Sequence, residues 1–235
     1  MKILYCSYSQ IPSDFANSIA VMQQCAALNK KADLFALFVR GHLNCRDVFK
    51  HYSVDHFPIK LLPQSALFCG ELGLKLSLLR HVLLQKADIV YSRDVLLNRF
   101  MCRFHIPNIY EIHQIDQENR KFDRCYKKQL LAIKDNRYLR AIVCISAALK
   151  RECLEFGIPE EKLIVLHSAV SIKSSHSNTT NVVSSIPKDG KPIAMYVGSL
   201  QKGKGIDIIL RMVELSDRYH FVIVGGKAGT CRFYL

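Results

Sequence analysis

The sequence lacks an apolar run long enough to cross a membrane, which takes about 20 consecutive apolar residues. Its most apolar stretch, residues 72–84, is interrupted by Lys75, Arg80 and His81. The apolar run at residues 3–6 is too short for a signal peptide. These absences predict a cytoplasmic protein that is either soluble or peripheral at the inner face of a membrane.

The cysteine spacing excludes two common kinds of cysteine site. The chain has nine cysteines, but no two lie closer than nine positions, so neither a CxxC redox pair nor a zinc ribbon can form. Several cysteines stand in apolar runs, as Cys144 does in "AIVCIS". We therefore predict buried free thiols in a reducing compartment.

Acidic residues are scarce relative to basic ones, with 20 Asp and Glu against 33 Lys and Arg and a formal net charge of +13. Such a balance suits nucleic acid, an anionic membrane or phosphorylated substrates. No platform of aromatic and arginine residues accompanies the charge, which argues against a nucleic-acid partner. A local basic cluster fits either a solvated helix face or contact with anionic lipid headgroups, and it comprises Arg120, Lys121, Arg124, Lys127 and Lys128.

Short apolar or β-branched runs alternate with longer helical patterns, which is typical of βα units around a parallel sheet. We predict strands at residues 3–6, 34–39, 89–92, 108–111, 142–145 and 163–166. Helices are predicted at residues 18–30, 71–86, 95–104, 118–138 and 147–156. Together these elements predict one doubly wound, Rossmann-like α/β domain over residues 1–170.

The composition changes after this first domain. Residues 171–191 are rich in Ser, Thr and Asn, and we predict that they form a linker. A strand at residues 193–197, a helix at 207–215 and a strand at 221–224 then begin a second domain over residues 192–235. A domain usually needs on the order of 100 residues to close a core. We therefore expect this second Rossmann-like domain to be incomplete, or truncated.

Polar residues follow the ends of the predicted strands, and open α/β sheets bind ligands beyond the carboxyl ends of their strands. Asn17 and Ser18 open the helix after the first strand, where backbone amides can hold an anion or a sugar hydroxyl. Arg93, His113 and Ser146 follow the third, fourth and fifth strands. Each residue alone also fits a structural role, but together they predict a cleft at this edge of the sheet.

A glycine-containing loop follows the first strand of the second domain, in "MYVGSLQKGKGIDIIL". Gly198 comes directly after the strand, and Lys204 and Gly205 precede the helix. Glycine lets backbone amides approach a phosphate, and a lysine beside a helix start adds positive charge. The loop lacks the Gly-Lys-Ser/Thr ending of a Walker loop. It is therefore either a diphosphate-binding turn or a lysine-rich surface turn.

These motifs together resemble glycosyltransferase family 4, the retaining transferases with the two-domain GT-B fold. The resemblance runs over nearly the whole chain and rests on "IPSDFANSIAVMQQ", "VYSRD", "YEIHQI", "AIVCISAALKRECLEFGIPEEKLIVLHSAV" and "MYVGSLQKGKGIDIIL". It implies transfer of a hexosyl-type group from a nucleoside-diphosphate sugar to a hydroxyl of a glycan, glycolipid or cell-envelope precursor. It implies no cofactor and no metal, because side chains and helix dipoles offset the diphosphate charge.

The resemblance also implies roles for individual residues. His113 would lie near the transferred sugar or the acceptor as the catalytic residue. Lys204 would contact the donor diphosphate, in a pocket shared with Gly198, Ser199 and Gly205, and Ser199 stands where many relatives carry an arginine. The alternative is an inactive remnant or an acceptor-binding module. The family's donor-sugar motif, two glutamates separated by seven residues, favours that alternative because it should lie beyond the last residue.

Overall fold

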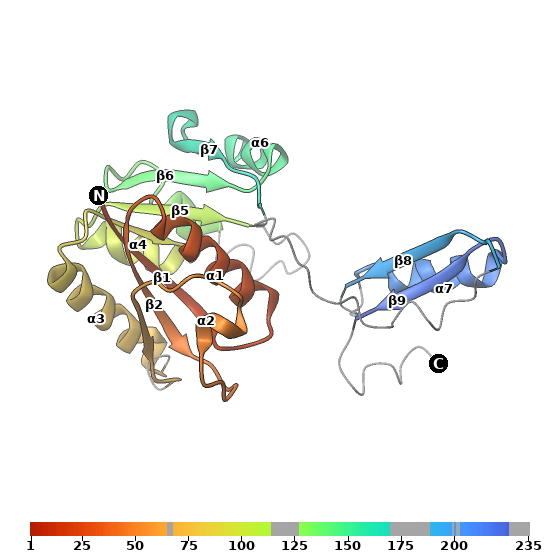
Figure 1. The fold of residues 1–235 in the computed structure, drawn as a ribbon. Helices are drawn as coiled ribbons and strands as arrows, with labels where there is room; N and C mark the ends of the chain where they lie inside the picture. The colour runs from red at the N-terminus through yellow and green to blue at the C-terminus, as the bar shows by residue number, and fades with distance from the viewer. Residues whose placement is uncertain (65–67, 114–126, 170–188, 199, 201–202, 226–235) are drawn as a thin grey trace. The chain divides into compact units, whose positions relative to one another are not determined.

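The computed structural model describes residues 1–64, 68–113, 127–169, 189–198, 200 and 203–225. The chain divides into two compact units, residues 1–172 and 173–235. The first unit carries a seven-stranded sheet, and the second carries a pair of strands with one helix (Figure 1). Among the described residues, no helix is both long and apolar enough to cross a bilayer.

The sheet of the first unit has the order β3-β2-β1-β4-β5-β6-β7, and every neighbouring pair is parallel. Its strands are β1 (Lys2–Ile11), β2 (Asp33–Arg40), β3 (Ile59–Leu62), β4 (Ile89–Ser92), β5 (Asn108–Ile112), β6 (Leu139–Cys144) and β7 (Leu163–Val165). The chain builds outward from β1 to β3 and then returns to start β4 on the other side of β1. This is the doubly wound topology, so the predicted α/β class is confirmed.

Helices cover both faces of this sheet. α1 (Ala16–Asn29) and α2 (Val48–His51) lie on one face, where Met22 packs with Tyr5 and Phe38 in a single cluster. α3 (Phe68–Gln85), α4 (Val95–Arg103) and α6 (Ala147–Glu155) lie on the other face, with buried contacts from Leu74, Leu78, Leu97, Met101, Leu149 and Cys153. Figure 1 shows α1 crossing in front of the strands. Because both faces are covered, the central strands are nearly continuous apolar runs.

The structure differs from the predictions for the first unit at several places. The first strand runs to Ile11 instead of ending at residue 6, and α2 was not predicted. The strand β3 was not predicted. It is a four-residue edge strand that pairs with β2 alone, and such a strand can fold without a long apolar run in the sequence. The helix predicted to run to residue 138 ends by residue 131 and is followed by turns. In those turns the Nζ of Lys162 donates to the carbonyl oxygens of Lys134 and Asn136, at 2.7 and 2.8 Å. The part of that predicted helix before residue 127 lies outside the described residues.

β1 is longer than its neighbours, and this shapes the carboxyl edge of the sheet. It pairs with β4 only as far as Cys6, which lies opposite Ser92, and then continues beside β2. The register shifts between Cys6 and Gln10, where the hydroxyls of Ser7 and Ser9 lie 2.9 Å apart. The pairing of β1 and β4 therefore stops at the point where doubly wound sheets bind ligands.

The second unit is described by itself as a parallel β–α–β segment. β8 (Ile193–Val197) pairs with β9 (His220–Val224) over five residues, and α7 (Ile206–Leu215) connects them. α7 begins after Gly205, whose φ of +79° lies in the left-handed region that glycine adopts most easily. Each of the three elements lies within one residue of its predicted bounds. The predicted linker, residues 171–191, lies almost wholly outside the described residues.

We expect Gly41→Ala to lower the free energy of unfolding by about 3 kcal/mol, the upper range for overpacking. A Cβ at this position would stand 2.0 Å from the carbonyl oxygen of Pro12, which is backbone and cannot rotate away. Urea denaturation of the full chain, followed by circular dichroism, measures the effect.

The matched control for this substitution is Gly157→Ala. Gly157 has a φ of +72°, but its added Cβ would meet nothing nearer than the Nζ of Lys134, at 3.4 Å. Left-handed backbone costs about 1–2 kcal/mol for alanine. If Gly41→Ala lowers the free energy of unfolding no more than Gly157→Ala does, position 41 does not lie against the carbonyl oxygen of Pro12.

Candidate functional site

Polar side chains gather on the α1 face of the sheet, at the strands where the order reverses. Tyr5 of β1 lies opposite Tyr91 of β4, and their rings stack with centroids 5.4 Å apart. The hydroxyl of Tyr5 donates to Oε1 of Gln24 on α1, at 2.8 Å. The Nε2 of Gln24 in turn lies 3.3 Å from the hydroxyl of Tyr91. These three side chains enclose a carboxylate that comes from β5.

That carboxylate belongs to Glu111. It accepts hydrogen bonds from Nε2 of Gln24, the hydroxyl of Tyr91 and Nε2 of His113. Oε1 of Glu111 also lies 3.6 Å from Nε of Arg93, and the two side chains are only 6% and 16% exposed. A buried carboxylate is costly unless it is paired and hydrogen-bonded. Here the donors come from α1, β4 and the residues that follow β4 and β5.

Burial by itself raises the pKa of the Glu111 carboxyl, because it removes water from the charged form. Hydrogen bonds from His113, Tyr91 and Gln24 outweigh burial, so this pKa ends below its ordinary value. Burial also raises the pKa of Tyr91, and the neighbouring Glu111 charge raises it further. At neutral pH the carboxyl is therefore ionised and the phenol stays protonated as its donor.

Both ring nitrogens of His113 are engaged in this cluster. Nε2 bonds to Glu111, and Nδ1 lies 3.0 Å from a terminal guanidinium nitrogen of Arg93. A guanidinium can only donate, so Nδ1 accepts and Nε2 carries the proton. The geometry thus fits a neutral imidazole in one tautomer. A carboxylate that fixes the tautomer of a histidine recurs in active sites, and here 31% of the histidine side chain remains exposed.

The structure brings Arg93 and His113 into contact, and their predicted place in a cleft stays a prediction. Ser18 is buried, and its hydroxyl donates to the carbonyl oxygen of Gln10 at 3.0 Å and accepts from Ser13 at 2.7 Å. Ser146 caps α6, where its hydroxyl accepts from the amide of Leu149 at 3.1 Å.

Both of these hydroxyls therefore have local structural partners. Asn17 is exposed in the first turn of α1. The cleft role of Ser18, Ser146 and Asn17 stays a prediction.

Sequence reasoning missed Glu111, Tyr91, Gln24 and Tyr5. One signal was present, because Glu111 is the single charged residue of the strand sequence "NIYEI". Charged residues are almost never buried unless they are paired. A carboxylate inside a buried strand therefore indicates a paired site. No comparable signal marks Gln24, whose role depends on how α1 crosses the sheet.

The predicted phosphate-binding residues lie at one end of the second unit. The amide of Gly198 donates to the carbonyl oxygen of Val224 at 3.0 Å, and a Cβ on Gly225 would stand 1.7 Å from the carbonyl oxygen of Gly198. Lys204 is exposed directly before α7, and Gly205 is the N-cap of that helix. Ser199 lies outside the described residues.

Burial is confirmed for five free thiols, Cys6, Cys25, Cys102, Cys144 and Cys153, whereas Cys45 is partly exposed. Burial raises the pKa of Cys25 and Cys6, which keeps these thiols protonated. Within the described part of the chain, no group of three or more His, Cys, Asp or Glu residues could hold a metal ion.

We expect Glu111→Gln to lower the free energy of unfolding at pH 7 by about 1–3 kcal/mol, because Arg93 loses its buried counter-charge. The folded-state pKa of Glu111 is lowered, so its stabilisation is present above the unfolded-state pKa. It is lost as the pH falls through the folded-state pKa, which lies below the ordinary value of a glutamate carboxyl. The loss of stability between pH 6 and this acidic range should therefore be smaller in Glu111→Gln than in the wild type. Urea titrations over this pH range measure it.

Glu160→Gln is the control for this substitution. Glu160 pairs with Lys150 at 3.0 Å, but its side chain is 71% exposed. Exposed ion pairs contribute little, so we expect a change of about 0.5 kcal/mol or less. Equal effects of the two substitutions would mean that the Glu111 cluster is not a buried electrostatic centre.

Solved structures similar to this chain share its fold. HepE from Anabaena in complex with UDP-glucose has a TM-score of 0.72 and 15% identity, over 100% of this chain and 63% of that chain. A glycosyltransferase from Rickettsia africae ESF-5 has a TM-score of 0.67 and 14% identity, over 99% and 62%. UDP-GlcNAc 2-epimerase from Neisseria meningitidis, bound to UDP-GlcNAc, has a TM-score of 0.63 and 14% identity, over 96% and 66%.

The chain thus spans about 63% of the length of HepE. No curated protein sequence matches it. Because transferases and an epimerase share this architecture, the fold alone does not choose between their reactions. The family match is more specific and covers residues 20–174, which include Arg93, Glu111 and His113. On this match, the chain belongs to Glycosyltransferase Family 4.

Proposed function

We propose that the chain is a glycosyltransferase that moves a sugar from a nucleoside-diphosphate sugar to a hydroxyl of a glycan, glycolipid or cell-envelope precursor. The observation that carries this proposal is the cluster of Arg93, Glu111 and His113 at the carboxyl ends of β4 and β5, in a member of Glycosyltransferase Family 4. The structure of HepE in complex with UDP-glucose supports a uridine nucleotide as the first donor to test.

In this proposal the second unit holds the donor diphosphate. The first amides of α7, which begins after Gly205, have no partners within the helix. The amide of Gly198 is already bonded to Val224, so Gly198 would line the site through its lack of a side chain. The exposed ammonium of Lys204 precedes the same helix. Amides and a lysine can offset the charge of a diphosphate. The proposed reaction therefore needs no metal ion, and transfer should continue in the presence of EDTA.

In the first unit we propose that His113 contacts the transferred sugar or the acceptor hydroxyl. Glu111 fixes the ring before substrate arrives, so little reorganisation is needed during the reaction. Arg93 adds a positive charge next to the ring, which suits an anionic group on either substrate. We further propose hexosyl transfer with retention of anomeric configuration, in keeping with the family resemblance.

The proposed function is tested by incubating the full chain with UDP-hexoses and a set of alkyl glycosides as acceptors. We expect UDP release that requires both substrates, and a product whose anomeric configuration matches that of the donor by NMR. Conversion of UDP-GlcNAc to its 2-epimer without an acceptor would favour an epimerase instead. Failure to bind any nucleoside-diphosphate sugar would contradict the proposal.

We expect Lys204→Ala to raise the Kd for UDP by about 5- to 150-fold, the range for losing a charge-assisted contact. Isothermal titration calorimetry with UDP measures this change. The control is Arg211→Ala, which removes an exposed positive charge from the same helix about 8 Å from its start. Equal affinities of the wild type and Lys204→Ala would remove this lysine from the site.

We expect His113→Ala to lower the rate of sugar transfer at saturating donor by about 100-fold or more, as for loss of one preorganised polar contact. The Kd for UDP should not change, because the proposed diphosphate site lies in the second unit. His56→Ala, which removes an exposed histidine between α2 and β3, is the control. A His113→Ala variant with wild-type turnover would show that the ring is structural.

A further inference from the structure

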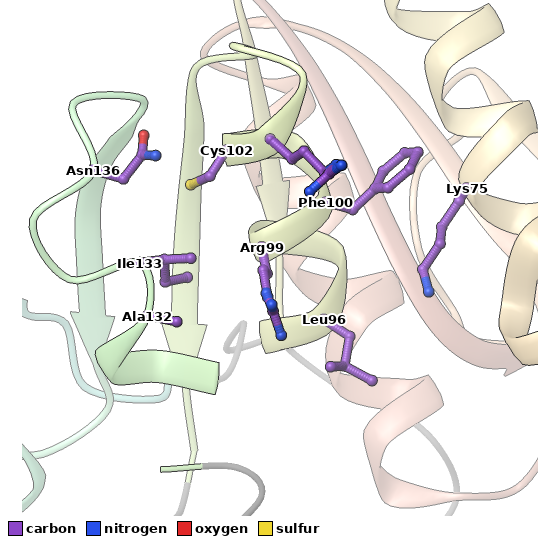
Figure 2. A pocket seen from close by; sticks show the side chains of 9 residues that line it. Lys75, Leu96, Arg99, Phe100, Cys102, Ala132, Ile133 and Asn136 are labelled. Carbon is purple, nitrogen blue, oxygen red and sulfur yellow. The ribbon is translucent and has the colours of Figure 1, made fainter. Parts of the chain in front are cut away.

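A pocket of about 410 Å³ opens on the sheet face opposite the Glu111 cluster. It lies between α4 and the segment around residues 132–136, with α3 at its side (Figure 2). Three of its nine lining residues are cations, Lys75, Arg99 and Arg103, and none of the nine is acidic. The remaining contacts include Leu96, Phe100 and Ile133. The pocket therefore combines positive charge with apolar walls.

The two arginines of this pocket have no ion pair with any described residue. Arg99 donates to Oε1 of Gln129, a neutral amide, and Arg103 is exposed near the end of α4. In Figure 2 the side chain of Lys75, from α3, extends beside Phe100 and Leu96 of α4. The cations of two helices thus stand around one opening, which favours an anionic ligand group.

The helix next to this pocket exposes several leucines together with Arg80. Leu72, Leu76 and Leu83 lie on one side of α3, because they are spaced four and seven residues apart. They are 49%, 56% and 78% exposed, whereas Leu74 and Leu78 point into the core. A surface helix normally shows polar residues on its outer side. An outer leucine stripe of this kind marks an interaction surface.

We propose that this α3–α4 surface docks the protein onto an anionic lipid bilayer. The phosphate of a lipid headgroup would enter the pocket beside Arg99 and Arg103, and the leucine stripe of α3 would enter the boundary between headgroups and acyl chains. Basic residues flanking exposed leucines are the combination that binds such interfaces. This proposal concerns a sheet face other than the one that carries His113, and it does not depend on the proposed reaction.

A second copy of the chain and a nucleic acid are the two other candidate occupants, and each fits only one part of this surface. In a symmetric dimer the same patch meets itself, so the basic residues of the two copies would face one another. Nucleic acid would match the charge but would leave the leucines of α3 without apolar partners. A bilayer with anionic headgroups satisfies both kinds of residue. The formal net charge of +13 strengthens its attraction to such a surface.

The test is co-sedimentation of the full chain with vesicles of phosphatidylcholine alone, or of phosphatidylcholine mixed with phosphatidylglycerol. We expect binding to the mixed vesicles that weakens as salt is added. Arg99→Ala with Arg103→Ala should lower the partition coefficient by about 30-fold, near five-fold for each cation. Leu76→Ser with Leu83→Ser should lower it at high salt as well, because these residues contribute apolar contact.

The control is Lys31→Ala with Arg46→Ala, which removes two exposed cations from the regions that follow α1 and β2. Equal losses in the control and the Arg99–Arg103 variant would show that net charge, not this surface, drives binding, and would overturn the proposal. Equal binding to the neutral and the mixed vesicles would show that anionic headgroups do not contribute, and would contradict the proposal. If the chain does not bind vesicles but forms a dimer that the leucine substitutions abolish, the surface binds a second copy and the proposal is wrong. Nucleic-acid binding without vesicle binding would likewise overturn the proposal.

Discussion

A carboxylate buried inside a parallel sheet must be surrounded by donors, and that requirement organises the first unit of this protein. Glu111 lies on β5, and its donors come from α1, β4 and the residues that follow β4 and β5. The charge can remain buried only when these elements take their native positions together. One acidic residue therefore couples the packing of α1 to the strand ends that present Arg93 and His113.

The two faces of the sheet carry different chemistry. On the α1 face, buried polar groups satisfy one another and hold a histidine in one orientation at the carboxyl edge of the sheet. On the other face the core beneath α3 and α4 is apolar, while the outer surface of these helices carries cations and exposed leucines.

Much of the fold could be predicted from the sequence, because parallel strands buried on both faces leave clear apolar runs. β3 was missed because a short edge strand leaves no such signal. The site was predicted in part: Arg93 and His113 follow strand ends, which is where doubly wound sheets bind ligands. Their partner Gln24 could not be predicted, because its contact depends on how α1 crosses the sheet. The charge of Glu111 within an apolar strand was a readable signal.

The central claim is that Glu111 fixes the ring of His113, and the tautomer of that ring tests it most directly. Long-range ¹H–¹⁵N correlation spectra of the full chain at neutral pH distinguish a proton on Nε2 from a proton on Nδ1. We predict a neutral His113 ring protonated at Nε2, and a mixture of tautomers in the Glu111→Gln variant. A ring protonated at Nδ1, or tautomers that average freely in the wild type, would contradict it.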